Sequence, residues 1–242
     1  MRVDVAFTPA ELPKGGAAGR TVVVIDVLRA TSSIVHALFN GARRIVPVTT
    51  VEEAVRKAEE LGRDAVLLCG ERDCLPIRGF DLGNSPEEFT AERVAGRTLV
   101  MSTTNGTPAL LASAGSAECL VGALLNAGAI ARRVAGAERD ALILCSGREG
   151  RFAYEDAFCA GLVLRRLRQL RPRVRTDDAG RAVLRLLGRG QGSPAPILRR
   201  SVAARRLQEV GLGQDVQFCA QVDLHDVIPS FVEQRIELTA GE

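Results

Sequence analysis

The chain has 242 residues, of which 46% are hydrophobic and 25% are charged, and its formal net charge is +3. This length is enough for one large core or for two small domains that share an interface. Aromatic residues make up only 4%, with no Trp, which argues against a surface that stacks nucleic-acid bases. No apolar run approaches the roughly 18 residues that span a membrane, and the N-terminus is too polar for a signal peptide. We therefore expect a cytoplasmic protein that does not contact membranes.

Short β-branched runs alternate with helical stretches along the first 170 residues. Strands are expected at 2–7, 21–27, 44–48, 64–69, 97–102, 117–121 and 140–145. Helices are expected at 31–39, 50–61, 86–94, 107–114, 127–136 and 154–170. Most of the strands are apolar on both faces, as in a sheet that is covered on both sides. The alternation predicts a three-layer α/β/α fold with a mostly parallel mixed sheet.

Local signals mark several helix starts. Thr50 with Glu53 predicts a capping box, in which each residue bonds the other's backbone. Ser85 followed by Pro86 predicts an N-cap and a proline in the first turn.

The pattern changes after residue 170. Helices are expected at 177–188 and 199–210, separated by the loop GRGQGSPAP, and two short extended runs fall within 215–238. We predict a single domain over residues 1–242 with a helical insertion. Whether residues 171–212 form a separate helical sub-lobe is left open. Whether the protein forms a homo-oligomer is also left open.

The segment 165–206 is rich in arginine, with Asp177 and Asp178 as its only acidic residues. A nucleic-acid surface is one interpretation. A solvated helical face is favoured, because the whole chain prefers arginine to lysine. We therefore predict no nucleic-acid partner.

Polar residues follow five of the expected strands at the points where those strands end. In open α/β sheets, ligands bind outside the carboxyl ends of the strands, so these residues mark a candidate site. They are Asp26, Arg29, Thr31, Ser32, Glu71, Arg72, Thr103, Thr104, Asn105, Gly106, Asn126, Arg148 and Arg151. The long connection 70–85 adds Arg78, Asn84 and Ser85, and long ordered loops in compact domains are usually functional.

This mixture of side chains suits a small, strongly anionic, phosphorylated substrate. Hydroxyls and helix N-terminal amides bind phosphate oxygens, and the arginine fork binds oxyanions through two hydrogen bonds. Carboxylates such as Asp26 and Glu71 are the oxygen ligands that Mg²⁺ prefers. A bound Mg²⁺ would neutralise phosphate charge and activate water.

Seven runs occur in order from about Val22 to Asp223: VVIDVLRATSS, GER, GFDLGNSP, TTNGT, LLNA, GREGRFAYEDAFCAG and DVQFCAQVD. Together they resemble the 2-phosphosulfolactate phosphatase family. The resemblance implies α/β layers about a mixed sheet. It also implies Mg²⁺-dependent hydrolysis of 2-phosphosulfolactate to sulfolactate and phosphate, a step toward coenzyme M. Two alternatives are left open. The substrate could be another phosphorylated hydroxy acid, and the phosphoryl group could be transferred to an acceptor other than water.

The matching positions also include Glu155 and Asp156. We expect Asp26, Glu71 and Asp156 to bind the metal, with Glu155 as a further candidate. The expected catalytic residues are Asp26, Arg29, Glu71, Arg72 and Asp156. The remaining residues of the strand ends and of the connection 70–85 are expected to bind substrate.

Cys145 supports a rival mechanism. Cys145 and Arg151 have the C-x₅-R spacing of phosphatases that use a thiolate nucleophile. The alternative is a buried cysteine at the end of a strand. We expect the other five cysteines to be small buried hydrophobic residues. We favour attack by metal-activated water. Neither histidine is expected to act in catalysis, because His36 lies in an apolar helix and His225 suits a cap or a pair.

Overall fold

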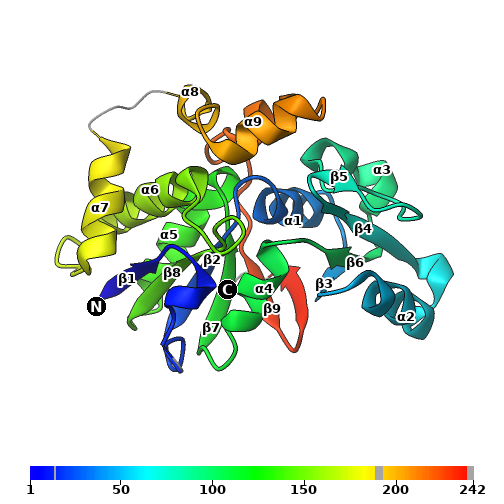
Figure 1. Ribbon diagram of the computed structural model, residues 1–242. Coiled ribbons are helices and arrows are strands. Elements are labelled where there is room, and N and C mark those ends of the chain that lie inside the picture. The colour runs from blue at the N-terminus through cyan, green and yellow to red at the C-terminus, as the bar shows by residue number, and fades with distance from the viewer. Residues whose placement is uncertain (14, 189–192, 239–242) are drawn as a thin grey trace.

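The computed structural model describes residues 1–13, 15–188 and 193–238 and contains one ten-stranded sheet (Figure 1). The strands are β1 (Val3–Ala6), β2 (Thr21–Ile25), β3 (Arg44–Val48), β4 (Val66–Arg72), β5 (Leu75–Pro76), β6 (Thr98–Ser102), β7 (Glu118–Gly122), β8 (Ala141–Cys145), β9 (Pro229–Val232) and β10 (Arg235–Leu238). The α-helices are α1 (Ala30–Phe39), α2 (Val51–Leu61), α3 (Ala91–Val94), α4 (Gly106–Ala112), α5 (Ala127–Gly136), α6 (Tyr154–Leu170), α7 (Asp178–Leu187), α8 (Ala195–Leu198), α9 (Val202–Glu209) and α10 (Gln214–Cys219). Short 3₁₀ turns are η1 (Pro9–Glu11), η2 (Arg63–Ala65), η3 (Pro86–Glu88) and η4 (Leu124–Asn126).

The predicted α/β class is confirmed, and each expected strand is present. Two local expectations were wrong and a third was half right. The single helix expected at 86–94 is two short pieces, η3 and α3, and α10 was not foreseen. The Ser85 side chain does not cap η3, because its hydroxyl bonds Asp215 instead. Half of the predicted capping box is present: the Thr50 hydroxyl accepts from the amide of Glu53 at the start of α2. The Glu53 carboxylate bonds the amide of Thr49 and not that of Thr50, so the second half is absent. Residues 189–192 of the predicted loop lie outside the described residues.

The sheet consists of two parallel blocks joined by an antiparallel hairpin. Its order is β1-β8-β2-β7-β9-β10-β3-β6-β4-β5. The pairings within β1-β8-β2-β7 and within β3-β6-β4 are parallel, whereas β7-β9, β9-β10 and β10-β3 are antiparallel. Three antiparallel steps reverse direction, so the two blocks run in opposite senses. The hairpin lies between the blocks (Figure 1).

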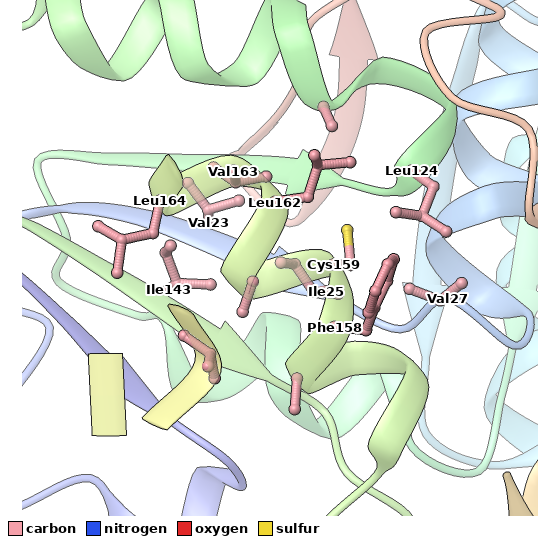
Figure 2. Packing of buried hydrophobic residues seen from close by; sticks show 14 of the residues in the cluster. Val23, Ile25, Val27, Leu124, Ile143, Phe158, Cys159, Leu162, Val163 and Leu164 are labelled. Atoms are coloured by element: carbon pink, nitrogen blue, oxygen red, sulfur yellow. The ribbon is translucent and has the colours of Figure 1, made fainter. Parts of the chain in front are cut away.

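Alternating residues of the strands pack into different cores, as the two-residue period of a strand requires. Val23, Ile25 and Ile143 pack with α6 residues such as Phe158, Val163 and Leu164 on the outer face of the first block (Figure 2). Val22 and Val24 point the other way. They belong to a second cluster that also holds residues of α1, α4 and the second block. A third cluster packs the far face of that block against α2. The shared second cluster brings the two blocks together around α1 and α4.

The segment 171–212 contributes to the core of the first block. Val183 and Leu187 of α7, Leu198 of α8 and Leu207 of α9 all belong to the cluster that contains α6. Several arginines of the segment 165–206 form ion pairs with acidic residues, such as Arg166 with Asp223, as expected for a solvated face. No helix in the described ranges is long and apolar enough to cross a membrane.

A histidine pair joins the C-terminal tail to α1. Nδ1 of His36 lies 2.9 Å from Nε2 of His225, and His225 stacks on Phe39. Asn40 Nδ2 lies 3.0 Å from the other ring nitrogen of His36. Burial and the nearby His36 lower the pKa of His225 to about 4. The pair therefore has a structural role, as expected for His36 from its apolar helix.

Candidate active site

A polar pocket lies where the carboxyl ends of β2, β4, β6 and β8 approach one another. Its empty volume, including the open mouth, is about 470 Å³. The residues that line it are Asp26, Leu28, Arg29, Ala30, Glu71, Asp73, Cys74, Asn84, Thr103, Thr104, Asn105, Arg148 and Glu149. They come from both parallel blocks. The pocket therefore depends on the packing that brings the two blocks together.

Asp26 directly follows β2 and is 7% exposed. Its Oδ1 accepts a long hydrogen bond from the amide of Ala30, 3.4 Å away, at the start of α1. Burial, followed by the negative charges of Glu71 and Glu155, raises the pKa of Asp26 to about 7. A carboxylate in this position would be stabilised by a cation in the pocket.

Glu71 and Asp156 each connect two loops that are distant in sequence. The Glu71 carboxylate accepts hydrogen bonds from the amides of Cys74 and Thr104, both at 2.9 Å. Asp156 accepts from the amides of Val27, at 2.9 Å, and Gly147, at 3.1 Å. Burial and the charge of Asp26 raise the pKa of Asp156 well above its usual range. Both carboxylates thus hold strand-end loops in place, and only Glu71 also lines the pocket.

Arg29 is the buried cation of the pocket. Its Nη1 donates to Oδ2 of Asp215 at 2.7 Å, and its Nη2 donates to the carbonyl oxygen of Cys74 at 2.6 Å. Asp215 was not among the residues singled out from the sequence. It is the first residue of the run DVQFCAQVD, and that position was the available signal.

The other predicted arginines occupy different positions. Arg148 lines the pocket and lies 3.8 Å from Glu149. Arg72 donates to the carbonyl oxygens of Glu71, Thr49 and Ser102 and to the Ser102 hydroxyl. Arg78 and Arg151 are exposed, and neither lines the pocket. The structure therefore places two of the five predicted arginines at the pocket.

The predicted hydroxyl and amide residues separate into two groups. Asn84, Thr103, Thr104 and Asn105 line the pocket. The side-chain oxygen of Asn84, a residue that is 4% exposed, has no hydrogen-bond partner among the described residues. A buried oxygen of this kind is available to accept a hydrogen bond from a ligand or a water.

The second group of predicted residues supports the fold. Thr31 and Ser32 donate to the backbone oxygens of Asp26 and Val27, which shapes the turn before α1. Asn126 uses its amide group on the backbone of Ala123, Val121 and Val227, so it does not reach the pocket. Ser85 bonds Asp215.

Gly106 starts α4 close to the start of α1. A Cβ added to Gly106 would lie 2.6 Å from Cβ of Ala30 and 3.1 Å from Oδ2 of Asp26. Only glycine allows the two helices to approach this closely.

The donor set of the pocket is compatible with a magnesium ion. Mg²⁺ usually takes one or two protein carboxylates and completes its shell with waters and substrate phosphate. Asp26 and Glu71 both line the pocket, and the charge of Glu71 raises the pKa of Asp26. The predicted four-carboxylate set does not gather there. Asp156 and Glu155 are not pocket residues, and no three His, Cys, Asp or Glu side chains in the described ranges form a cluster that could hold a metal by themselves.

Cys145 lies in the core of the first block and does not line the pocket. Burial and the charge of Asp156 raise the pKa of its thiol well above the usual range. The C-x₅-R spacing therefore does not form a phosphate cradle here.

The pocket lies where open α/β sheets bind their ligands, and its arginines suit an anion. The fold and this pocket therefore define an α/β protein whose candidate site suits a small anionic ligand. The family model for 2-phosphosulpholactate phosphatase matches residues 6–234. The chain belongs to this family and is a phosphatase, that is, a hydrolase of phosphoric monoesters.

Curated relatives agree with the family. The chain is 42% identical over 210 residues to a protein of Caldanaerobacter subterraneus subsp. tengcongensis, with 87% of each chain covered. It is 42% identical over 213 residues to a protein of Thermotoga petrophila, covering 88% of this chain and 89% of the relative. It is 35% identical over 236 residues to a protein of Clostridium acetobutylicum, covering 98% of this chain and 100% of the relative. All three relatives are named probable 2-phosphosulfolactate phosphatase.

Proposed function

We propose that the protein hydrolyses 2-phosphosulfolactate to sulfolactate and phosphate with the help of Mg²⁺. The observation that carries this proposal is the pocket itself, in which the carboxylates of Asp26 and Glu71 lie with Arg29 and Arg148. The relatives' names support the substrate. That the reaction is a step toward coenzyme M, and that the protein is cytoplasmic, are still predictions.

We propose that Asp26 and Glu71 hold the ion. When bound, Mg²⁺ neutralises phosphate charge and lowers the pKa of a coordinated water. Asp26 is the better placed ligand, because it accepts one long backbone hydrogen bond, from Ala30 at 3.4 Å, whereas Glu71 accepts two at 2.9 Å. The backbone bonds to Glu71 fix its orientation, which a second ligand needs.

The substrate class follows from charge. 2-Phosphosulfolactate carries a phosphate, a carboxylate and a sulfonate on three carbons. Arg29 is buried and Arg148 is partly exposed, so they can bind different anionic groups. Buried cations are costly unless an anion meets them. Among the described residues, only the exposed Glu149 lies within ion-pair distance of Arg148. Arg148 is therefore the better candidate for the carboxylate or sulfonate.

The test measures phosphate release from 2-phosphosulfolactate and from 4-nitrophenyl phosphate, each with Mg²⁺ and with excess EDTA. A charged hydrogen bond contributes about 1.5–3 kcal/mol, so the anionic substrate should have a kcat/KM roughly a hundredfold higher. EDTA should abolish activity, and added Mg²⁺ should restore it. Equal efficiencies would contradict the substrate class, and full activity in EDTA would contradict the metal.

A further inference from the structure

Asp215 connects two walls of the pocket from outside it. It lies on α10 in the C-terminal tail, and its side chain is fully buried. Oδ2 accepts from Nη1 of Arg29 at 2.7 Å, and Oδ1 accepts from the hydroxyl of Ser85 at 2.6 Å. Ser85 follows the pocket residue Asn84, whose carbonyl oxygen accepts from the hydroxyl of Ser33 on α1. One carboxylate therefore holds the start of α1 and the 84–85 segment together.

The contacts of Arg29 leave part of its guanidinium available. Arginine has five N–H donors in a fixed planar fork. Asp215 and the carbonyl oxygen of Cys74 account for two of them, and Arg29 itself lines the pocket. The planar fork means that holding one edge also fixes the direction of the others. The position of Asp215 thus decides where the remaining donors of Arg29 lie.

Arg29 also has competing partners. Asp26 and Glu71 line the same pocket, and the charge of Arg29 lowers the pKa of Asp26, against the larger effects of burial and Glu71. Without the charge of Asp215, a buried guanidinium would be attracted to these two carboxylates. It would then occupy the groups that suit a cation and leave the place where an anion binds.

We propose that Asp215 is a positioning residue, which keeps the Arg29 guanidinium directed at the substrate anion and away from Asp26 and Glu71. This inference rests on the proposed function in one respect, namely that the pocket binds a phosphorylated anion. A purely structural role would be limited to neutralising Arg29. The two roles predict different affinities for phosphate and Mg²⁺ in a folded variant that lacks the charge of Asp215.

The main variant is Asp215→Asn, which retains the shape of the side chain and removes its charge. We expect kcat/KM for 2-phosphosulfolactate to fall at least tenfold. The Mg²⁺ concentration for half-maximal activity should rise about tenfold, and the Kd for inorganic phosphate, measured by calorimetry, should rise by a similar factor. Asp226→Asn is the matched control, because Asp226 lies in the same tail with a side chain that is 80% exposed. In Asp226→Asn, kcat/KM, the Mg²⁺ concentration for half-maximal activity and the Kd for phosphate should all be unchanged.

Ser85→Ala provides a milder perturbation if Asp215→Asn does not fold. It removes one hydrogen bond from Asp215 and should weaken phosphate binding about threefold. In Arg29→Ala, added guanidinium should restore part of the activity, because Asp215 still offers its carboxylate. The double variant Arg29→Ala, Asp215→Asn should not be rescued.

The outcomes separate the two hypotheses. Folded Asp215→Asn with normal phosphate affinity, normal Mg²⁺ dependence and normal kcat/KM would overturn the positioning role. If Asp215→Asn does not fold, Ser85→Ala with normal phosphate affinity would overturn it equally. If the unmodified protein hydrolyses no phosphate ester, the proposed function fails. The comparison of phosphate affinities would then still decide on Asp215.

Discussion

Replacing Gly106 by Ala tests how closely α1 and α4 must approach to form the pocket. The new Cβ would lie 2.6 Å from Cβ of Ala30, whereas carbon atoms in contact prefer about 3.5–4.0 Å. One helix must therefore move by about 1 Å. Overpacking of this kind costs roughly 1–3 kcal/mol, so the melting temperature should fall by about 3–10 °C. The shift also displaces Asp26, and kcat/KM should fall at least tenfold, since a misplacement of about 1 Å can cost a hundredfold.

Gly136→Ala is the matched control for this substitution. Gly136 ends α5, and no atom lies within 4 Å of an added Cβ. This variant should keep full activity and be as stable as the unmodified protein, or more stable by up to about 1 kcal/mol. Thermal unfolding and initial-rate assays on both variants are sufficient. Gly106→Ala with the stability and activity of Gly136→Ala would refute the argument from close approach.

Three further predictions concern other parts of the molecule. Cys145→Ser should lose less than about tenfold in kcat by initial-rate assay, because the buried thiol does not reach the pocket; a folded but inactive variant would instead identify a thiolate nucleophile. Arg148→Ala should reduce the kcat/KM preference for 2-phosphosulfolactate over 4-nitrophenyl phosphate about tenfold, whereas Arg72→Ala should leave it unchanged, because Arg72 bonds backbone carbonyls and the Ser102 hydroxyl. The pKa of His225 falls from 6.5 to about 4 on folding, so its contribution to stability is complete above pH 6.5 and is lost as the pH falls toward 4. Asp26, with its pKa raised to about 7, acts in the opposite direction over the same range, so the test compares two proteins that both contain it. In urea titrations between pH 7.5 and 5, the free energy of unfolding of the unmodified protein should fall relative to that of His225→Gln.

Local patterns in the sequence determined the secondary structure and the place of the site. Apolar β-branched runs predicted the strands, since a strand covered on both faces must be apolar throughout. The polar residues at the strand ends predicted a site there, and Asp26, Glu71 and Arg29 do line the pocket. These inferences depend on neighbours along the chain, which a sequence displays directly.

Residue types alone could not separate ligand-binding side chains from those that support the fold. Asn126 and Asn84 are both buried amides, yet the first is bonded to backbone groups and the second has an oxygen with no partner among the described residues. Arg72 and Arg148 differ in the same way. A hydrogen-bond partner that is distant in sequence decides each case.

The sequence by itself determined the α/β class, the strand-end position of the site and the chemistry of its side chains. Tertiary structure alone decided the antiparallel hairpin between the blocks, the approach of α4 to α1 at Gly106 and the role of Asp215. The physical reason is that these features arise from contacts between segments far apart in the chain. Asp215 is 186 residues from Arg29, and no local pattern records which buried carboxylate will neutralise which buried arginine.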